Sequence, residues 1–196
     1  MPRLEPSKAI PDDIAAILAG FEASLGFVPA SLGLMTHLPD VLRAFVGLSR
    51  AVMAPSERVP PPLKQMIAHV VSQAAGCRYC QAHTAHRAHE VGVDAEKIDQ
   101  LWSFEHSPLF SPGERAALRL AMLAGQAPSA VEDADTAAVT AAFGPEGLAE
   151  ITAVIAHFGF LNRWNDTLAT PLEDAPRAFA ALGLSRSGWT VGNHAG

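Results

Sequence analysis

The chain has 196 residues, of which 49% are hydrophobic and 17% charged, and its net charge is −6 at pH 7. This length suffices for one domain with a substantial buried core. The mildly acidic charge excludes the basic footprint of a nucleic-acid-binding protein. No charged start leads into an apolar run, and the longest apolar stretch, residues 151–161, is shorter than a membrane span. We therefore expect a soluble cytoplasmic protein with neither a nucleic-acid nor a membrane partner.

Apolar residues recur with the period of a helix along nearly the whole chain, and no convincing alternation typical of strands is present. The expected helices cover residues 14–25, 41–52, 63–75, 77–91, 95–104, 112–122, 130–142, 148–168 and 175–182. This succession of helical segments predicts an all-α fold.

Local signals mark where several of these helices begin and end. Three prolines at 60–62 precede the third helix, where they are tolerated because the first N–H groups of a helix have no helical partners. Gly76 stands where a glycine is expected after a helix C-terminus. Asp94 is the expected N-cap of a later helix. The segment 111–114, with serine, proline and a final glutamate, predicts a capping box.

The Pro-rich segment 54–62 is the best candidate for a boundary within the chain. We expect an N-terminal helical layer over residues 1–55 and a helical core that carries the cysteines over residues 56–184. Residues 185–196 lack a periodic apolar pattern and predict a loose C-terminal tail.

The two cysteines of the chain, Cys77 and Cys80, lie three residues apart. A secreted disulfide framework would use more cysteines spread along the chain, so this pair indicates metal binding or thiol chemistry. A helix that begins at Cys77 places both thiols in its first turn, near unpaired N–H groups and the positive end of the helix dipole. This placement predicts a lowered thiol pKa and a nucleophilic thiolate.

Three histidines follow at the same spacing: His83, His86 and His89. Three residues rotate a helix by about 300°, so successive positions drift around the axis by roughly 60°. His83 therefore shares a face with the cysteines and is the predicted proton partner of Cys80. His86 and His89 turn away from that face and are predicted to be solvated.

The preceding helix carries two further candidates. Gln65 and His69 are four residues apart on one helical face, and a tight turn at Gly76 would fold the next helix back against them. His69 would then reach the thiols directly or through water. The alternative is that both residues form the polar flank of a core helix.

Two metal chemistries also use cysteine and histidine. Covalent c-type haem requires a histidine directly after the second cysteine, where this chain has Gln81. Zinc is compatible with Cys77, Cys80 and His83, but a closed tetrahedral site needs a fourth ligand and His86 points off the shared face. Zinc binding therefore stays open as an alternative.

A set of short motifs surrounds the cysteines. They are Gln65, Val71-Ser72, Gly76 to Cys80, His83-Thr84, Gly92-Val93, Glu96 to Ile98, Ser111 to Ala117 and Phe160 to Arg163. Together they resemble the alkyl hydroperoxidase D (AhpD-like) group of the carboxymuconolactone decarboxylase superfamily. The resemblance extends over roughly residues 38–170 and is specific at the cysteine motif.

The resemblance implies an AhpD-like helical bundle that works as a homo-oligomer, commonly a trimer or a hexamer. It also implies the reduction of hydroperoxides, with Cys80 as the peroxidatic cysteine and Cys77 as the resolving one. Decarboxylase members typically lack the CxxC motif, so its presence favours the peroxidase-related branch.

Two positions depart from the pattern that the resemblance implies. The proton relay of the family uses a glutamate twelve residues before the first cysteine, where this chain has Gln65. Its histidine lies four residues after the second cysteine, where this chain has Thr84. His83 and His69 are the candidates to replace this relay.

We therefore predict a thiol-dependent peroxidase that reduces alkyl hydroperoxides through a dithiol–disulfide cycle. It would need an external thiol or dithiol reductant and no metal or organic cofactor. The predicted site residues are Cys80, Cys77, His83, His69 and Gln65. The alternatives are a disulfide oxidoreductase, and a non-enzymatic helical oligomer that binds zinc or senses oxidants.

Overall fold

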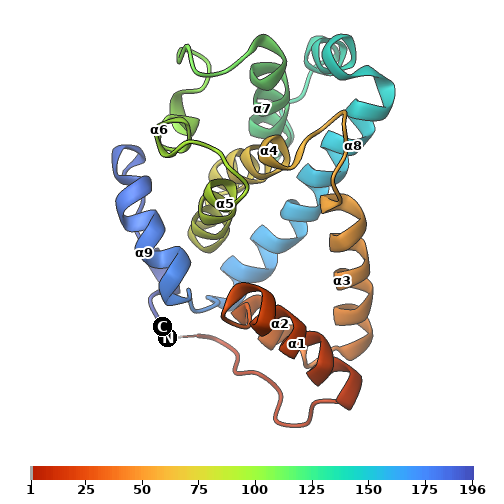
Figure 1. Cartoon of the computed structure of the whole chain (residues 1–196), viewed down its shortest axis with the longest axis vertical. Coiled ribbons are helices and arrows are strands. Elements are labelled where there is room, and N and C mark those ends of the chain that lie inside the picture. The colour runs from red at the N-terminus through yellow and green to blue at the C-terminus, as the bar shows by residue number, and fades with distance from the viewer. Residues whose placement is uncertain (1) are drawn as a thin grey trace.

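A computed structural model describes residues 2–196, and every regular element in this range is a helix (Figure 1). The α-helices are α1 (Asp12–Leu25), α2 (Ala30–Met35), α3 (Pro39–Met53), α4 (Pro61–Ala74), α5 (Arg78–Glu90), α6 (Ala95–Asp99), α7 (Pro112–Ala124), α8 (Asp133–Leu168) and α9 (Asp174–Gly183). Short 3₁₀ helices are η1 (Leu101–Ser103), η2 (Ser185–Ser187) and η3 (Gly192–His194). The prediction of an all-α fold is confirmed.

Helix α4 lies at the centre of the fold and packs against α5, α7 and α8 (Figure 1). Its apolar stripe is buried: Leu63, Met66, Ile67, Val70 and Val71. Helix α9 packs along α5, while α1, α2 and α3 form the other end of the molecule around a second apolar cluster. Leu161 of α8 packs against both clusters, so α8 joins the two ends.

The turn between α4 and α5 is a Schellman motif. Gly76 adopts a left-handed backbone with φ of 80°. Its N–H donates to the carbonyl of Gln73 (3.1 Å), and the N–H of Cys77 donates to the carbonyl of Ser72 (3.0 Å). Glycine carries no Cβ that would oppose this conformation, which explains why α4 ends where the sequence predicts. The turn delivers Cys77 directly to the start of α5.

Other predicted helix signals are also present. Ser111 and Glu114 form the expected capping box at the start of α7. Asp94 occupies the N-cap position of α6, although its side chain makes no cap hydrogen bond. Helix α8 breaks at Gly144, whose φ of 73° is not helical, and Pro145 follows. This break separates the two segments that the sequence predicts as distinct helices.

Helix α8 would also pass as a membrane-crossing segment by length and composition alone. Core helices of soluble proteins satisfy the same criterion. In this fold α8 packs against α3, α4, α5 and α7. The side chains that it buries include polar ones: His157, Asn162 and Asn165.

The structure corrects three of the sequence predictions. Helix α2 was not predicted, because its six residues are too few to show a period. The single helix expected over residues 95–104 is split into α6 and η1. The C-terminal segment 185–196 is not loose: Trp189 Nε1 donates to the Arg78 carbonyl (3.1 Å), and the His194 carbonyl accepts from the Leu172 N–H (3.0 Å). Single anchoring side chains hold it, and these leave no periodic pattern.

A buried lysine links α4 to α3 and α8. Lys64 is 1% exposed, and its Nζ donates to the carbonyls of Val52 (2.8 Å) and Ala54 (2.6 Å). The same Nζ lies 2.7 Å from the Glu150 carboxylate of α8. The ammonium group therefore satisfies the C-terminal end of α3 and neutralises a partly buried anion.

We expect Lys64→Met to lower the free energy of unfolding by about 3 kcal/mol, because the Glu150 carboxylate and two carbonyls lose their partner. Denaturant unfolding measures this change. The matched control is Lys8→Met, since Lys8 is exposed. A loss as small as that of the control would mean that water replaces the ammonium group at no cost.

Candidate active site

Cys77 and Cys80 are both reduced and buried at the start of α5, with exposed fractions of 0% and 2%. Cys77 is the N-cap residue, and its Sγ accepts the backbone N–H of Cys80 at 3.3 Å. The side chain of Asn165, from α8, donates its Nδ2–H to Cys80 Sγ at 3.4 Å. The two sulfurs thus share one helix turn but have different neighbours.

The expected lowering of the thiol pKa is not found at Cys80. Burial raises the pKa of the Cys80 thiol well above its ordinary value, and the neighbouring Cys77 sulfur raises it further. The hydrogen bond from Asn165 acts in the opposite direction and is outweighed. The sequence shows that a helix begins here but not that the turn is excluded from water. Desolvation decides the direction of the shift.

Cys80 opens into a cavity of about 330 Å³ between α1, α2, α3, α4, α5 and α8. The walls are largely apolar and include four phenylalanines: Phe21, Phe27, Phe45 and Phe158. Polar and charged residues also line it: Ser24, Ser31, Ser49, Gln65, Tyr79, His83, Thr84, His86, Arg87, Glu90, His157 and Asn165. Cys77 is not part of this lining. A small apolar molecule with few polar groups fits such a cavity, and it would meet Cys80 first.

His83 lines the cavity but its ring is held by a carboxylate from the C-terminal part of the chain. Its Nε2 lies 2.6 Å from Glu173 Oε2. The other carboxylate oxygen of Glu173 accepts the Tyr79 hydroxyl (2.9 Å) and the Ala30 N–H. Since the carboxylate accepts a hydrogen from Nε2, the Nδ1 lone pair is the basic position of the neutral His83 ring.

Burial and hydrogen bonding shift the pKa values of Glu173 and Tyr79, the two residues next to His83. Burial alone would raise the pKa of Glu173, but the hydrogen bond and charge of His83, together with the Ala30 N–H, lower it overall. Burial raises the pKa of Tyr79 well above its usual value, and the charge of Glu173 adds to this effect. Glu173 is therefore held as a carboxylate, with the Tyr79 hydroxyl and the His83 ring as its partners.

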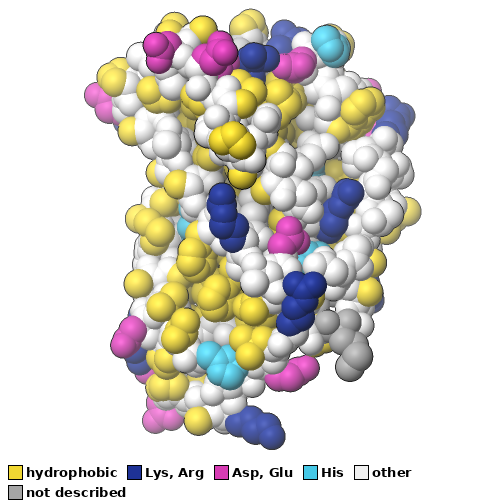
Figure 2. All heavy atoms as spheres, turned by 180° about the vertical axis from the view of Figure 1, so that it is seen from behind, with side chains coloured by type: hydrophobic (Ala, Val, Ile, Leu, Met, Phe, Trp, Pro, Cys, Tyr) yellow, Lys and Arg dark blue, Asp and Glu magenta, His cyan; other side chains and the backbone are white. Residues whose placement is uncertain are grey.

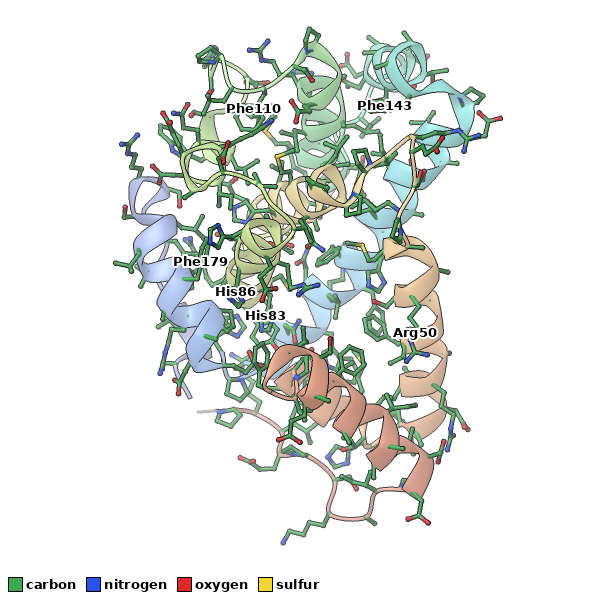
Figure 3. The ribbon with its side chains drawn as sticks, viewed as in Figure 1. Arg50, His83, His86, Phe110, Phe143 and Phe179 are labelled. Atoms are coloured by element: carbon green, nitrogen blue, oxygen red, sulfur yellow. The ribbon has the colours of Figure 1, made fainter. Side chains whose placement is uncertain are left out.

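Two histidines expected to be solvated lie beside this group. Figure 3 shows His86 near His83 in the region between α5 and α9, with Phe179 of α9 beside it. His86 lines the cavity, and burial lowers its pKa. His89 is exposed and stacks on Phe179, with ring centroids 5.2 Å apart. His86 therefore belongs to the edge of the cavity, while His89 does not.

The two candidate residues on α4, Gln65 and His69, lie in different surroundings. Gln65 lines the cavity together with Cys80. His69 is buried behind α5, where its Nδ1 lies 3.1 Å from the carbonyl of Gln81 and 3.2 Å from Thr84 Oγ1. Burial lowers the pKa of His69 to about 4, so the ring is neutral at pH 7. These contacts tie α4 to α5, and the ring does not line the cavity.

Cys77 faces a different set of groups. Its Sγ, a carboxylate oxygen of Asp166 and a ring nitrogen of His194 all lie within 4.8 Å of one another. The zinc ligand set considered from the sequence is not assembled, because His83 is turned to Glu173. The ring of His194 has both nitrogens in hydrogen bonds, so it offers no free lone pair to a cation without rearrangement.

Several site residues were missed by the sequence analysis: Tyr79, His157, Asn165, Asp166, Glu173 and His194. Apart from Tyr79, which lies inside the CxxC motif, they come from α8 or from the chain after it. Two signals were available in the sequence. His157 interrupts an apolar helix, and Asn165 and Asp166 lie on the same helix as other buried positions. Neither signal shows which side chain on α5 each residue meets.

The carboxymuconolactone decarboxylase family model matches residues 39–122. The debrominase Bmp8 is 35% identical in its apo structure, which covers 85% of this chain and 89% of that chain with a TM-score of 0.78. The chain belongs to the AhpD/carboxymuconolactone decarboxylase superfamily. The resemblance found in the sequence is therefore confirmed.

Other relatives in the superfamily extend the comparison. A cysteine-to-alanine variant of Bmp8 in complex with 2,3,4-tribromopyrrole is 32% identical, with a TM-score of 0.82 over 92% of this chain and 96% of that chain. A peroxidase-related protein with an AhpD core from Ralstonia eutropha JMP134 is 26% identical, with a TM-score of 0.81 over 94% and 96%. The uncharacterized protein YnjA of Escherichia coli K12 is 28% identical over 66% of this chain and 69% of its own length.

His157 is a cavity residue with an unsatisfied ring. It is 4% exposed, stacks on Phe45 at 5.0 Å between centroids, and its Nδ1 has no hydrogen-bond partner among the described residues. Burial lowers its pKa to about 4 from the ordinary value of 6.5. The folded protein therefore holds a neutral ring over a pH range in which the unfolded chain carries a proton there.

This difference predicts acid destabilisation. Because the unfolded state binds more protons, the stability supplied by neutral His157 is complete above about pH 6.5 and is lost progressively toward about pH 4. We expect His157→Phe to reduce this loss by on the order of 2 kcal/mol. Denaturant unfolding at several pH values measures it, with exposed His106→Gln as the control. An unchanged pH slope in His157→Phe would mean that the ring is protonated in the fold.

Proposed function

We propose that the protein is a thiol-dependent peroxidase whose dithiol reduces organic hydroperoxides. The observation that carries this proposal is the asymmetric placement of a reduced CxxC pair. Cys80 opens into the apolar cavity, while Cys77 lies one helix turn behind it and outside the lining. A nucleophile that meets substrate and a second thiol close behind it are the two parts that a dithiol cycle needs.

The cycle balances with these groups alone and a reductant. The Cys80 thiolate attacks the terminal peroxide oxygen, the O–O bond breaks, and the alcohol leaves after taking a proton. The resulting sulfenic acid on Cys80 is attacked by Cys77, which forms the S–S bond and releases hydroxide that becomes water with one proton. An external dithiol then reduces the disulfide and is itself oxidised, so two electrons pass from it to the peroxide.

The pair of His83 and Glu173 supports this cycle as a proton relay. Glu173 fixes the ring of His83 through Nε2, which leaves Nδ1 free to exchange a proton within the cavity. His83 would take the Cys80 proton when substrate enters and return it to the departing alkoxide. Such assistance is needed because burial keeps Cys80 protonated at rest.

The cavity also favours one substrate class. Its exposed wall surface is more apolar than polar, and its volume of about 330 Å³ exceeds what hydrogen peroxide alone would fill. Burial of an alkyl or aryl group supplies binding free energy of about 25 cal/mol per Å² of apolar area, which hydrogen peroxide lacks. We therefore place organic hydroperoxides ahead of hydrogen peroxide as substrates.

We further propose a homo-oligomer, a trimer or a hexamer, acting in a reducing compartment such as the cytoplasm. Large apolar side chains are exposed on α3 and on the second half of α8: Val41, Leu48 and Phe160. Figure 2 shows hydrophobic side chains gathered on the lower half of the reverse face. Burying them in a subunit interface would account for their exposure.

Reductive debromination is a second candidate function. It is favoured by the similarity to Bmp8, which is higher in sequence identity than that to the peroxidase-related proteins. In that reaction the Cys80 thiolate attacks bromine, the C–Br bond breaks, and the carbanion takes a proton. Cys77 then displaces bromide from Cys80 and forms the same disulfide. Both chemistries use one dithiol, so they differ only in the electrophilic atom presented to Cys80.

Substrate consumption by the pure protein with a dithiol reductant tests these proposals. We expect cumene hydroperoxide to be consumed by the wild type, with Cys80→Ser inactive and Cys77→Ser limited to about one turnover. Bromide release from a bromopyrrole, measured in parallel, tests the second candidate. Disulfide exchange without either substrate would instead favour a disulfide oxidoreductase. Peroxide consumption at equal rates in wild type and Cys80→Ser would exclude the peroxidase.

The relay is tested by Glu173→Gln. Its amide can donate to His83 Nε2, which moves the ring hydrogen to Nδ1 and removes the base from the cavity. We expect kcat to fall by between about 10-fold and about 100-fold, with little change in KM. Exposed Glu22→Gln is the matched control. A rate equal to that of the control would show that the cycle runs without this carboxylate.

A further inference from the structure

The sulfur of Cys77 lies against the C-terminal segment. Its neighbours are Asp166, from the last turn of α8, and His194 of η3, within 4.8 Å of one another. His194 is 0% exposed although it is the third residue from the end of the chain. The proposed function assigns no role to this histidine or to its carboxylate partner.

The hydrogen bonds of His194 determine how many protons its ring carries. Nδ1 lies 2.8 Å from the carbonyl oxygen of Thr170, which can only accept, so Nδ1 must carry a hydrogen. Nε2 lies 3.0 Å from Asp166 Oδ1, and an ionised carboxylate also only accepts. Two acceptors facing the two nitrogens require two hydrogens, and a ring with both is an imidazolium.

This cation is held where water screens it little. His194 is fully buried, whereas the Asp166 side chain is 39% exposed, so solvent screens the carboxylate more than the ring. The backbone N–H of Cys80 donates to the sulfur of Cys77. His194, its partner Asp166 and the backbone N–H of Cys80 therefore surround the Cys77 sulfur, while the Cys80 sulfur accepts from the Asn165 amide.

We propose that the His194–Asp166 pair is the charge partner of Cys77 and keeps this thiol ionised. Charged Cys77 is then ready to attack an oxidised Cys80 without a proton acceptor of its own. In the reductive half, an external thiolate bonds to the Cys80 sulfur and the S–S bond breaks. Its electron pair departs on Cys77, whose negative charge His194 stabilises. His194 acts through Cys77 and is a positioning residue, delivered by the C-terminal segment.

Other titratable or charged groups also lie near Cys77. Cys80 shares the helix turn and is protonated at rest. The Tyr79 ring lies 5.8 Å from that of His194, and its hydroxyl is occupied by Glu173. The side chain of Arg78 runs beside Gly192 at the start of η3. Among the described groups, His194 is the cation whose geometry with Cys77 is fixed by buried hydrogen bonds.

The test measures alkylation of Cys77 by iodoacetamide in a Cys80→Ser background between about pH 5 and about pH 9. The alkylation rate rises with pH as Cys77 loses its proton and then reaches a plateau. The height of the plateau reports how accessible the sulfur is, and the pH of the rising limb reports when the thiol becomes charged. We expect His194→Gln to move the limb to higher pH and to lower the rate at neutral pH by about tenfold. Glutamine can still donate to the Thr170 carbonyl, and exposed His106→Gln is the control.

The outcomes are decisive in either direction. A shifted limb supports the proposal, whereas a changed plateau with an unchanged limb would mean that the segment only covers Cys77. Histidine ¹⁵N spectra of the unsubstituted protein give a second measurement that needs no variant. They should show both His194 nitrogens protonated at neutral pH, and a neutral ring would overturn the proposal. Neither experiment uses peroxide, so both test the charge of Cys77 independently of the result of the peroxidase assay.

Discussion

The left-handed turn at Gly76 is the constraint on which the site depends. It ends α4 and makes Cys77 the N-cap residue of the next helix. A side chain at position 76 would oppose the positive φ, and a looser turn would remove Cys77 from the N-cap. The backbone N–H of Cys80 could then no longer reach the Cys77 sulfur. The placement of the two thiols at the start of α5 therefore depends on this glycine.

Once the turn is fixed, α8 and the segments after it give the two sulfurs different surroundings. Cys80 faces the cavity and the amide of Asn165, with the ring of His83 on the same wall. Cys77 faces away from the cavity toward Asp166 and His194. A dithiol cycle uses this difference, because one sulfur must accept an electrophile while the other must attack or depart as an anion. A symmetric environment would leave the order of the steps undetermined.

Local signals predicted the parts of the fold that depend on neighbours in the chain. The turn at Gly76, the break near Gly144 and the placement of His83 on the cysteine face all follow from spacing and backbone preference. The partner of His83 could not be predicted, because Glu173 is 90 residues away and no periodic pattern links them. The raised pKa of the Cys80 thiol could not be predicted either, because it depends on burial by parts of the chain distant in sequence, such as Asn165 of α8, which contacts the sulfur.

The proposed relay would preserve the chemistry of the site although the motif changes. Gln65 stands where the resemblance implies a glutamate, and Glu173 from the start of α9 supplies a carboxylate to a histidine of the same helix as the cysteines. The reaction requires a carboxylate in contact with an imidazole, and this carboxylate can come from α4 or from the start of α9. The family match ends at residue 122. The residues Asn165, Asp166, Glu173 and His194, which lie near the two sulfurs or His83, all come after it. Differences in activity between members that share the CxxC motif are therefore expected to arise in this C-terminal third, where the partners of both sulfurs lie.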